Sequence, residues 1–147
     1  MKKIRDHGSC FVCGKTNPNS IGVEWYVGDE NQIDARFIFA KNHEGPPGFV
    51  HGGASAAVLD EAMGLAIWYA GYRVVTVNLN LDYRKPVPLG EPIQIHGALS
   101  NKTNRHVEAT GHIALPDGTV AVFAKGIFVE GAQFLDQANL QDFKRQK

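Results

Sequence analysis

Cysteine is scarce in this chain: Cys10 and Cys13 are the only two among 147 residues. Two cysteines cannot form the disulfide framework of a small secreted protein, so we expect a reducing, cytoplasmic setting. An excess of one charge sign is also missing, because 15 basic residues balance 15 acidic residues. A neutral chain offers no general attraction for nucleic acids or anionic membrane surfaces, and we expect neither as a partner.

Long apolar runs are missing as well. The longest, Ala62 to Gly71, follows Asp60 and Glu61 and is far shorter than the roughly 20 residues of a membrane-spanning helix. The first ten residues have no apolar core, so no secretory signal is expected. No internal repeat or linker interrupts the sequence, and its length predicts one domain over residues 1–147.

Much of the chain alternates apolar and polar residues, as strands with one buried face do. Two such strands are expected within residues 21–39, on either side of the turn-like Gly28-Asp29-Glu30-Asn31. The alternation returns over residues 75–82, 93–95, 107–115 and 119–129, with polar turns such as residues 100–104 between them. Connections this short require antiparallel pairing.

Residues 53–70 do not show this alternation. Apolar side chains occupy most of their positions, and proline is absent. This length suits a helix of about five turns, and a helix that is apolar nearly all round is a buried one. One buried helix among antiparallel strands predicts an α+β fold in which a curved sheet wraps the helix. Residues 1–20 are expected to form a loop holding the Cys-x-x-Cys pair, and residues 131–147 a tail with a weak helical pattern.

Asp60 stands in the middle of this apolar helix. A buried carboxylate costs several kcal/mol unless it is paired or has a function. Burial also raises the pKa of a carboxyl group toward the range that suits a general base. Glu61 points about 100° further round the helix, so we expect Glu61 to face solvent while Asp60 faces inward.

His51, Gly52 and Gly53 stand where a proline-containing loop becomes this helix. The first N–H groups of a helix have no intrahelical acceptor, and they form a site for a developing oxyanion. Gly52 and Asp60 are about 12 Å apart along the helix axis, so one carbonyl cannot reach both. A two-fold dimer with antiparallel helices would bring Asp60 of one subunit to Gly52 of the other.

Four motifs within residues 10–130 point to a known family. They are Cys10-Phe-Val-Cys-Gly with Asn17-Pro18, Gly45-Pro-Pro-Gly-Phe-Val-His-Gly-Gly-Ala, Leu59-Asp-Glu-Ala-Met-Gly, and Thr76-Val-Asn-Leu-Asn-Leu-Asp-Tyr-Arg-Lys-Pro-Val-Pro. Together they resemble the hotdog-fold acyl-CoA thioesterases of the phenylacetate-pathway and 4-hydroxybenzoyl-CoA type. The resemblance implies a hotdog fold, hydrolysis of an acyl-CoA thioester, and no cofactor beyond the coenzyme A of the substrate.

The resemblance also implies roles for single residues. Asp60 corresponds to the catalytic acid and the Gly52 N–H to the oxyanion donor, across a dimer. His51 and Gly53 would shape the oxyanion hole, and Thr76 would orient the attacking water. Whether Asp60 acts as general base or as nucleophile stays open.

Coenzyme A carries phosphates, and phosphates need cations at the mouth of the site. Arg84, Lys85 and Arg105 are the candidates, and Asn78 and Glu61 are further candidates for binding substrate. Acyl preference would depend on a tunnel shaped by Trp25, Met63, Ile67 and Trp68 in an arrangement that the sequence does not give. The sequence predicts a homodimer at minimum and does not separate a dimer from a tetramer.

Two alternative functions and a possible metal site also have to be considered. The fold also serves dehydratases and hydratases of acyl thioesters, and a non-catalytic protein that binds acyl-CoA would keep the fold without turnover. His7, Cys10 and Cys13 are three possible zinc ligands. A closed zinc site requires a fourth, and no second cysteine pair exists, so we expect no metal.

Overall fold

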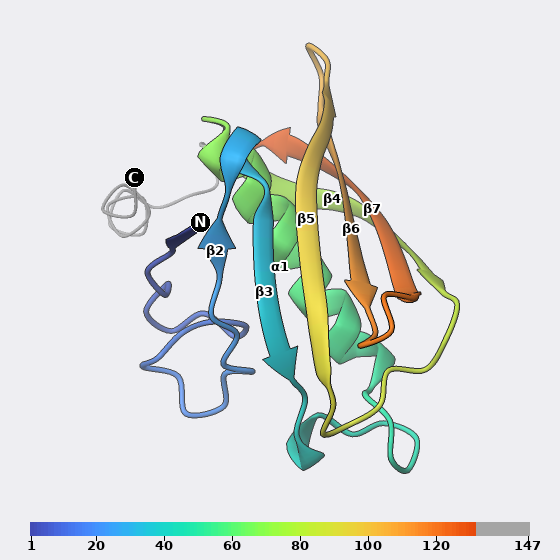
Figure 1. Ribbon diagram of the computed structural model, residues 1–147. Helices are drawn as coiled ribbons and strands as arrows, with labels where there is room; N and C mark the ends of the chain where they lie inside the picture. The colour runs from blue at the N-terminus through green and yellow to red at the C-terminus, as the bar shows by residue number, and fades with distance from the viewer. Residues whose placement is uncertain (132–147) are drawn as a thin grey trace.

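The computed structural model describes residues 1–131, and within them one long helix, α1 (Gly52–Tyr69), is wrapped by a curved, seven-stranded antiparallel sheet (Figure 1). This architecture confirms the predicted hotdog fold. The strand order is β1-β2-β3-β5-β6-β7-β4. The strands are β1 (Lys2–Lys3), β2 (Tyr26–Val27), β3 (Ile33–Ile38), β4 (Val74–Tyr83), β5 (Pro92–Lys102), β6 (Val107–Ala114) and β7 (Val120–Glu130), and η1 (Asp29–Asn31) and η2 (Lys41–His43) are short 3-10 helices. In the described part of the chain, no helix has the length and apolar character that crossing a bilayer requires.

Helix α1 is buried on most of its circumference, as its composition predicts. Nine of its 18 residues are buried. Two glycines that lie opposite each other in β5 and β6, Gly97 and Gly111, face the helix. A Cβ atom on Gly97 would lie 2.6 Å from the carbonyl group of Ala62 in α1. The sheet approaches the helix closely because these two positions carry no side chain.

The predicted strand before Gly28 is wrong in extent, since β2 contains only Tyr26 and Val27. The residues before it pair with the N-terminal loop instead of with a strand. The backbone N–H groups of Ile21 and Gly22 donate to the carbonyl oxygens of Phe11 and Val12. Strand β5 is longer than predicted and continues to Lys102, through much of the expected turn. The predicted helix in the tail falls on residues 132–147, outside the described residues.

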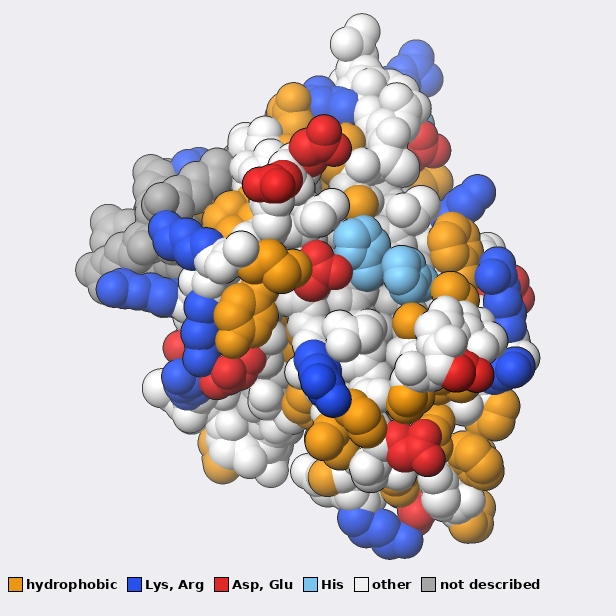
Figure 2. Space-filling model, in the orientation of Figure 1, with side chains coloured by type: hydrophobic (Ala, Val, Ile, Leu, Met, Phe, Trp, Pro, Cys, Tyr) orange, Lys and Arg blue, Asp and Glu red, His pale blue; other side chains and the backbone are white. Residues whose placement is uncertain are grey.

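The outer face of the sheet is polar where it covers the middle of the molecule. Figure 2 shows histidine side chains side by side near the middle of this face, with an acidic side chain next to them. His96 on β5 and His112 on β6 have ring centroids 5.1 Å apart, and His96 Nδ1 lies 2.7 Å from Asp34 Oδ1 on β3. The apolar side chains of the same strands point the other way and form the core with α1.

Strand β4 lies at one end of the sheet and pairs with β7 alone among the described strands. Its N-terminal part lies beside the middle of α1, where Thr76 contacts Asp60. Its C-terminal end lies beside the start of α1, where Tyr83 contacts Gly52. Strand β4 and helix α1 therefore run in opposite directions, and β4 connects the two predicted parts of the site.

Candidate active site

A cavity of about 650 Å³ lies beside the middle of α1. One stripe of the helix lines it, with Ala57, Asp60, Gly64 and Trp68 spaced three or four residues apart. The N-terminal loop and the start of β4 form the other walls, and most of the lining is apolar. A largely apolar cavity of this size with a few polar groups in its wall, here including the carboxylates of Asp60 and Glu61, is typical of a small-molecule site.

Asp60 and Thr76, to which the family resemblance assigns roles in catalysis, both line this cavity. The Thr76 hydroxyl donates a hydrogen bond of 2.7 Å to Asp60 Oδ1. Asp60 is half-buried and faces the cavity, so a water molecule or a substrate can reach its carboxylate. The bond fixes the carboxylate relative to β4.

The expected orientation of Glu61 is wrong. Its side chain is only 13% exposed, and Trp25 Nε1 donates a hydrogen bond of 2.5 Å to Glu61 Oε2. Burial raises the pKa of Glu61, although His7 partly offsets this effect. The physical reason is that the N-terminal loop folds over this side of α1, with His7 Nδ1 at 3.5 Å from Glu61 Oε1. Glu61 therefore lies where the loop, the helix and the cavity meet.

The start of α1 offers one free N–H group rather than two. His51 is the N-cap residue, and its Nδ1 accepts a hydrogen bond of 2.8 Å from the Gly53 N–H. Gly53 is thus not available as a donor to a ligand, contrary to expectation, because its N–H is already used in capping the helix. Among the described residues, the Gly52 N–H has no acceptor. Tyr83, which the sequence did not single out, donates a hydrogen bond of 2.7 Å to the Gly52 carbonyl oxygen.

Gly52 lines a second cavity, of about 310 Å³, together with Tyr83, Arg84 and Lys85. The bare N–H group and two of the predicted cations therefore lie together. Arg84 Nε donates to Asp82 Oδ2 at 3.0 Å, which orients the guanidinium at this opening. This cavity and the one at Asp60 share no lining residue, so the two halves of the predicted site are separate within one chain.

Two other predicted substrate contacts lie apart from both cavities. Arg105 is in the turn between β5 and β6 and lines a different pocket with neighbouring residues of that turn. Asn78 is exposed on β4 and lines neither the cavity at Asp60 nor the one at Gly52.

The prediction of which residues shape the acyl tunnel is mostly wrong. Met63 and Ile67 are completely buried and Trp25 is 2% exposed, so all three belong to the core. Trp68 does line the cavity at Asp60. Gly64 and Phe128 line it too, and neither was expected there from the sequence. Glycine inside a helix lowers its stability by about 1 kcal/mol relative to alanine. This unfavourable residue in the middle of a helix was a sign in the sequence that Gly64 has a special position.

Comparisons with known proteins agree with the fold. Residues 47–122 match the family model described as the thioesterase superfamily. The acyl-coenzyme A thioesterase THEM4 of Xenopus laevis is 36% identical over 120 residues, which are 80% of this chain and 54% of that protein. THEM4 of Rattus norvegicus is 33% identical over 114 residues, 71% of this chain and 49% of that protein. The chain thus spans about half the length of the curated relatives it matches.

Solved structures of other proteins also share this fold. The crystal structure of a thioesterase superfamily protein superposes with a TM-score of 0.80 at 32% identity, covering 83% of this chain and 60% of that one. A Bacillus halodurans protein crystallised with CoA superposes with a TM-score of 0.66 at 23% identity, covering 76% of this chain and 75% of that one. The second match shows a shared fold alone.

Proposed function

Since this chain belongs to the thioesterase superfamily, we propose that it hydrolyses the thioester bond of an acyl-coenzyme A, releasing a free acid and coenzyme A. The observation that carries the proposal is Asp60, held by Thr76 in the wall of a mostly apolar cavity. The relatives named as acyl-coenzyme A thioesterases support the substrate class.

The complete site requires a second subunit. Asp60 and Gly52 are about 12 Å apart along α1, so one thioester cannot contact both within a chain. Strand β4 has ten residues, and in the described part of the chain its outer edge has no partner strand. Val77 at this edge is 55% exposed. A long free edge of this kind is a template for pairing with another strand.

Antiparallel pairing of two copies of β4 would assemble the site. Thr76 marks the end of β4 beside Asp60, and Tyr83 marks the end beside Gly52. A two-fold axis between Leu79 and Asn80 would set Thr76 of one subunit opposite Tyr83 of the other. This arrangement would bring each Asp60 toward the Gly52 N–H of the partner, giving two equivalent sites per dimer.

The chemistry then needs few groups. Asp60 takes a proton from water, the water oxygen attacks the thioester carbonyl carbon, and the negative oxygen is stabilised by the Gly52 N–H. The tetrahedral intermediate breaks its C–S bond, and coenzyme A leaves as a thiolate that is then protonated. In the alternative route, the Asp60 carboxylate attacks the carbonyl carbon itself and the C–S bond breaks, so that coenzyme A leaves as a thiolate. Water then hydrolyses the resulting anhydride to the free acid and the Asp60 carboxylate. Arg84 and Lys85 would bind the phosphates of the coenzyme.

The test is the release of free thiol from short, long and aromatic acyl-CoAs. Asp60→Asn should lower kcat by about 10²- to 10⁴-fold, because the amide cannot accept the proton. Equal release by the wild type and Asp60→Asn would overturn the assignment. Thermal stabilisation by acyl-CoA without thiol release would indicate a binding protein, and hydration of an enoyl-CoA without thiol release would indicate a hydratase.

A second pair of variants tests the N–H group at Gly52. Proline is favoured at the first position of a helix, and His51 already has the extended backbone that must precede it, with φ −60° and ψ 134°. Gly52→Pro therefore removes the N–H with little strain and should lower kcat by about 10²- to 10³-fold. Gly52→Ala keeps the N–H and is the matched control, since an added Cβ would lie 3.5 Å from the Tyr83 ring.

A further inference from the structure

Four metal-ligating side chains converge where the N-terminal loop crosses α1. One ligand atom from each of His7, Cys10, Cys13 and Glu61 can be chosen so that all four lie within 4.8 Å of one another. Cys10 Sγ is 2.7 Å from Glu61 Oε1, and His7 Nδ1 is 3.1 Å from Cys13 Sγ. Ligands of a tetrahedral zinc ion lie about 3.3–3.8 Å apart, given the usual zinc–ligand distances. Glu61 Oε1 has this spacing to His7 Nδ1 (3.5 Å) and to Cys13 Sγ (3.6 Å), while the other two distances are shorter, so small side-chain shifts would accommodate a zinc ion.

We propose that His7, Cys10, Cys13 and Glu61 form a structural zinc site that fastens the N-terminal loop to the middle of α1. The sequence predicts no metal because no second cysteine pair supplies a fourth ligand alongside His7, Cys10 and Cys13. Glu61 supplies it from a position 48 residues beyond Cys13, on a different element. Four protein ligands fill the tetrahedral shell, which makes the site structural rather than catalytic.

The turn between the cysteines directs both sulfur atoms to the same place. The Gly14 N–H donates to the Cys10 carbonyl oxygen at 2.8 Å, and the Val12 N–H lies 3.3 Å from Cys10 Sγ. Gly14 has no room for a side chain, since a Cβ atom would lie 2.3 Å from the Cys10 nitrogen. Backbone N–H groups that point at a sulfur stabilise it as a thiolate, the form that binds metal.

Glu61 is oriented as a ligand by a second contact. Trp25 Nε1 holds Oε2, which leaves Oε1 facing His7 and the two cysteines. A carboxylate that is 13% exposed and packed against two sulfur atoms requires compensating positive charge, and its pairing with His7 Nδ1 at 3.5 Å supplies at most one positive charge. A divalent cation balances most of the charge of two thiolates and one carboxylate. A set of four ligands that includes two thiolates and one imidazole favours tetrahedral zinc over magnesium or calcium.

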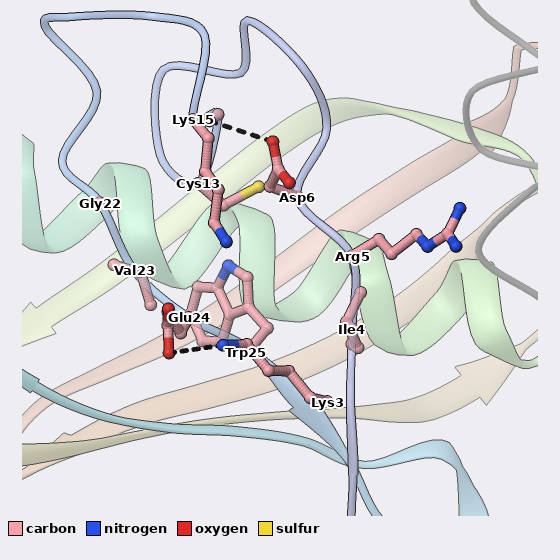
Figure 3. A pocket seen from close by; sticks show the side chains of 11 residues that line it. Lys3, Ile4, Arg5, Asp6, Cys13, Lys15, Gly22, Val23, Glu24 and Trp25 are labelled. Atoms are coloured by element: carbon pink, nitrogen blue, oxygen red, sulfur yellow. Dashed lines mark hydrogen bonds and ion pairs between the residues drawn. The ribbon is translucent and has the colours of Figure 1, made fainter.

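The position of the cluster explains why the loop needs such a link. Phe11 and Val12, between the two cysteines, line the cavity that contains Asp60. On another side, Cys13 and Trp25 line a separate cavity of about 330 Å³, formed by residues 3–6, 13–15 and 22–25 (Figure 3). The loop thus lies between two cavities, where apolar packing is incomplete. A metal link would fix the wall that the loop contributes to the candidate active site.

Metal content of the purified full chain tests the proposal independently of any enzymatic activity. Protein expressed with added zinc sulfate should contain about one zinc ion per chain, measured by inductively coupled plasma mass spectrometry. The double variant Cys10→Ser, Cys13→Ser should contain almost none, and Glu61→Gln should lose zinc to a chelator much faster than the wild type. Glu24→Gln, at an exposed glutamate paired with Lys3, is the matched control and should behave like the wild type.

Cobalt provides a readout that does not depend on the variants folding. Metal-free, reduced wild-type protein titrated with Co²⁺ should develop thiolate-to-cobalt charge transfer and the visible bands of a tetrahedral complex, saturating at one equivalent. Absence of these bands would overturn the proposal, as would a zinc content that the cysteine variants do not change. Recovery of a Cys10–Cys13 disulfide from protein kept under reducing conditions would also overturn it.

Discussion

The Thr76 hydroxyl on β4 is hydrogen-bonded to Asp60 Oδ1 on α1 at 2.7 Å. The bond joins the two elements that border the candidate active site. It uses one oxygen of the carboxylate, and among the described residues the other oxygen has no hydrogen-bond partner. Thr76 therefore sets the direction in which Asp60 can accept a proton, which makes it a positioning residue.

Replacing Thr76 tests this role. Thr76→Val keeps the shape of the side chain and removes the hydroxyl, so Asp60 should lose its fixed direction and kcat should fall about 10- to 100-fold. Thr76→Ser keeps the hydroxyl and should retain most of the activity. The measurement is kcat and KM for thiol release from one acyl-CoA. A valine variant with the kcat of the serine variant would contradict the role.

The long helix was predictable from the sequence, because it follows from the apolar composition of one continuous segment. The roles of Asp60 and Thr76 came from the family resemblance, and their hydrogen bond joins two elements that the sequence pattern alone does not place side by side. The orientation of Glu61 was not predictable. On a helix that is covered nearly all round, two adjacent acids can each face inward, and the choice depends on which side the N-terminal loop covers. That loop joins Glu61 through His7 and Cys10, which are distant in sequence.

The availability of the glycine N–H groups likewise depended on a side-chain conformation. Histidine is not among the common N-cap residues, so nothing in the sequence indicated that His51 would accept a hydrogen bond from Gly53. The capping leaves Gly52 as the donor. The separation of Gly52 from Asp60 was predictable, because it follows from helix geometry alone.

Mixing two inactive variants tests whether the site crosses subunits. Asp60→Asn and Gly52→Pro each damage both sites of a homodimer, but a mixed dimer would contain one site with an intact Asp60 and an intact Gly52. Co-expression with different tags should therefore restore about a quarter of the wild-type activity in a statistical mixture. Each variant expressed alone is the control. If purified mixed dimers are no more active than the single variants, Asp60 and Gly52 do not act across an interface.

Gly64 should control the size of the acyl group. It lines the cavity at Asp60, and a Cβ atom there would lie 3.9 Å from Phe128, in ordinary contact. Gly64→Ala should raise the free energy of unfolding by about 0.5–1 kcal/mol, because alanine favours the helix. Gly64→Leu should project into the cavity and lower kcat/KM for long and aromatic acyl-CoAs by about tenfold or more.

Short acyl-CoAs are the internal control for Gly64→Leu, since a substrate that leaves this part of the cavity empty should be hydrolysed at nearly the wild-type rate. An equal loss for short and long substrates would show that the leucine damages the site in general. Unchanged selectivity would place the acyl group elsewhere.

The histidines on the outer face of the sheet should make stability depend on pH. Burial lowers the pKa of His112 below its ordinary value of 6.5, His96 lowers it further, and Asp34 partly offsets both effects. The unfolded chain therefore binds more protons than the folded chain just below pH 6.5, so the stabilisation is complete above this value and is lost as the pH falls. In urea unfolding, the wild type should lose more stability on acidification from neutral pH than His112→Gln does. His106→Gln, at the turn between β5 and β6, is the matched control and should lose as much as the wild type; the same loss in His112→Gln would contradict the assignment.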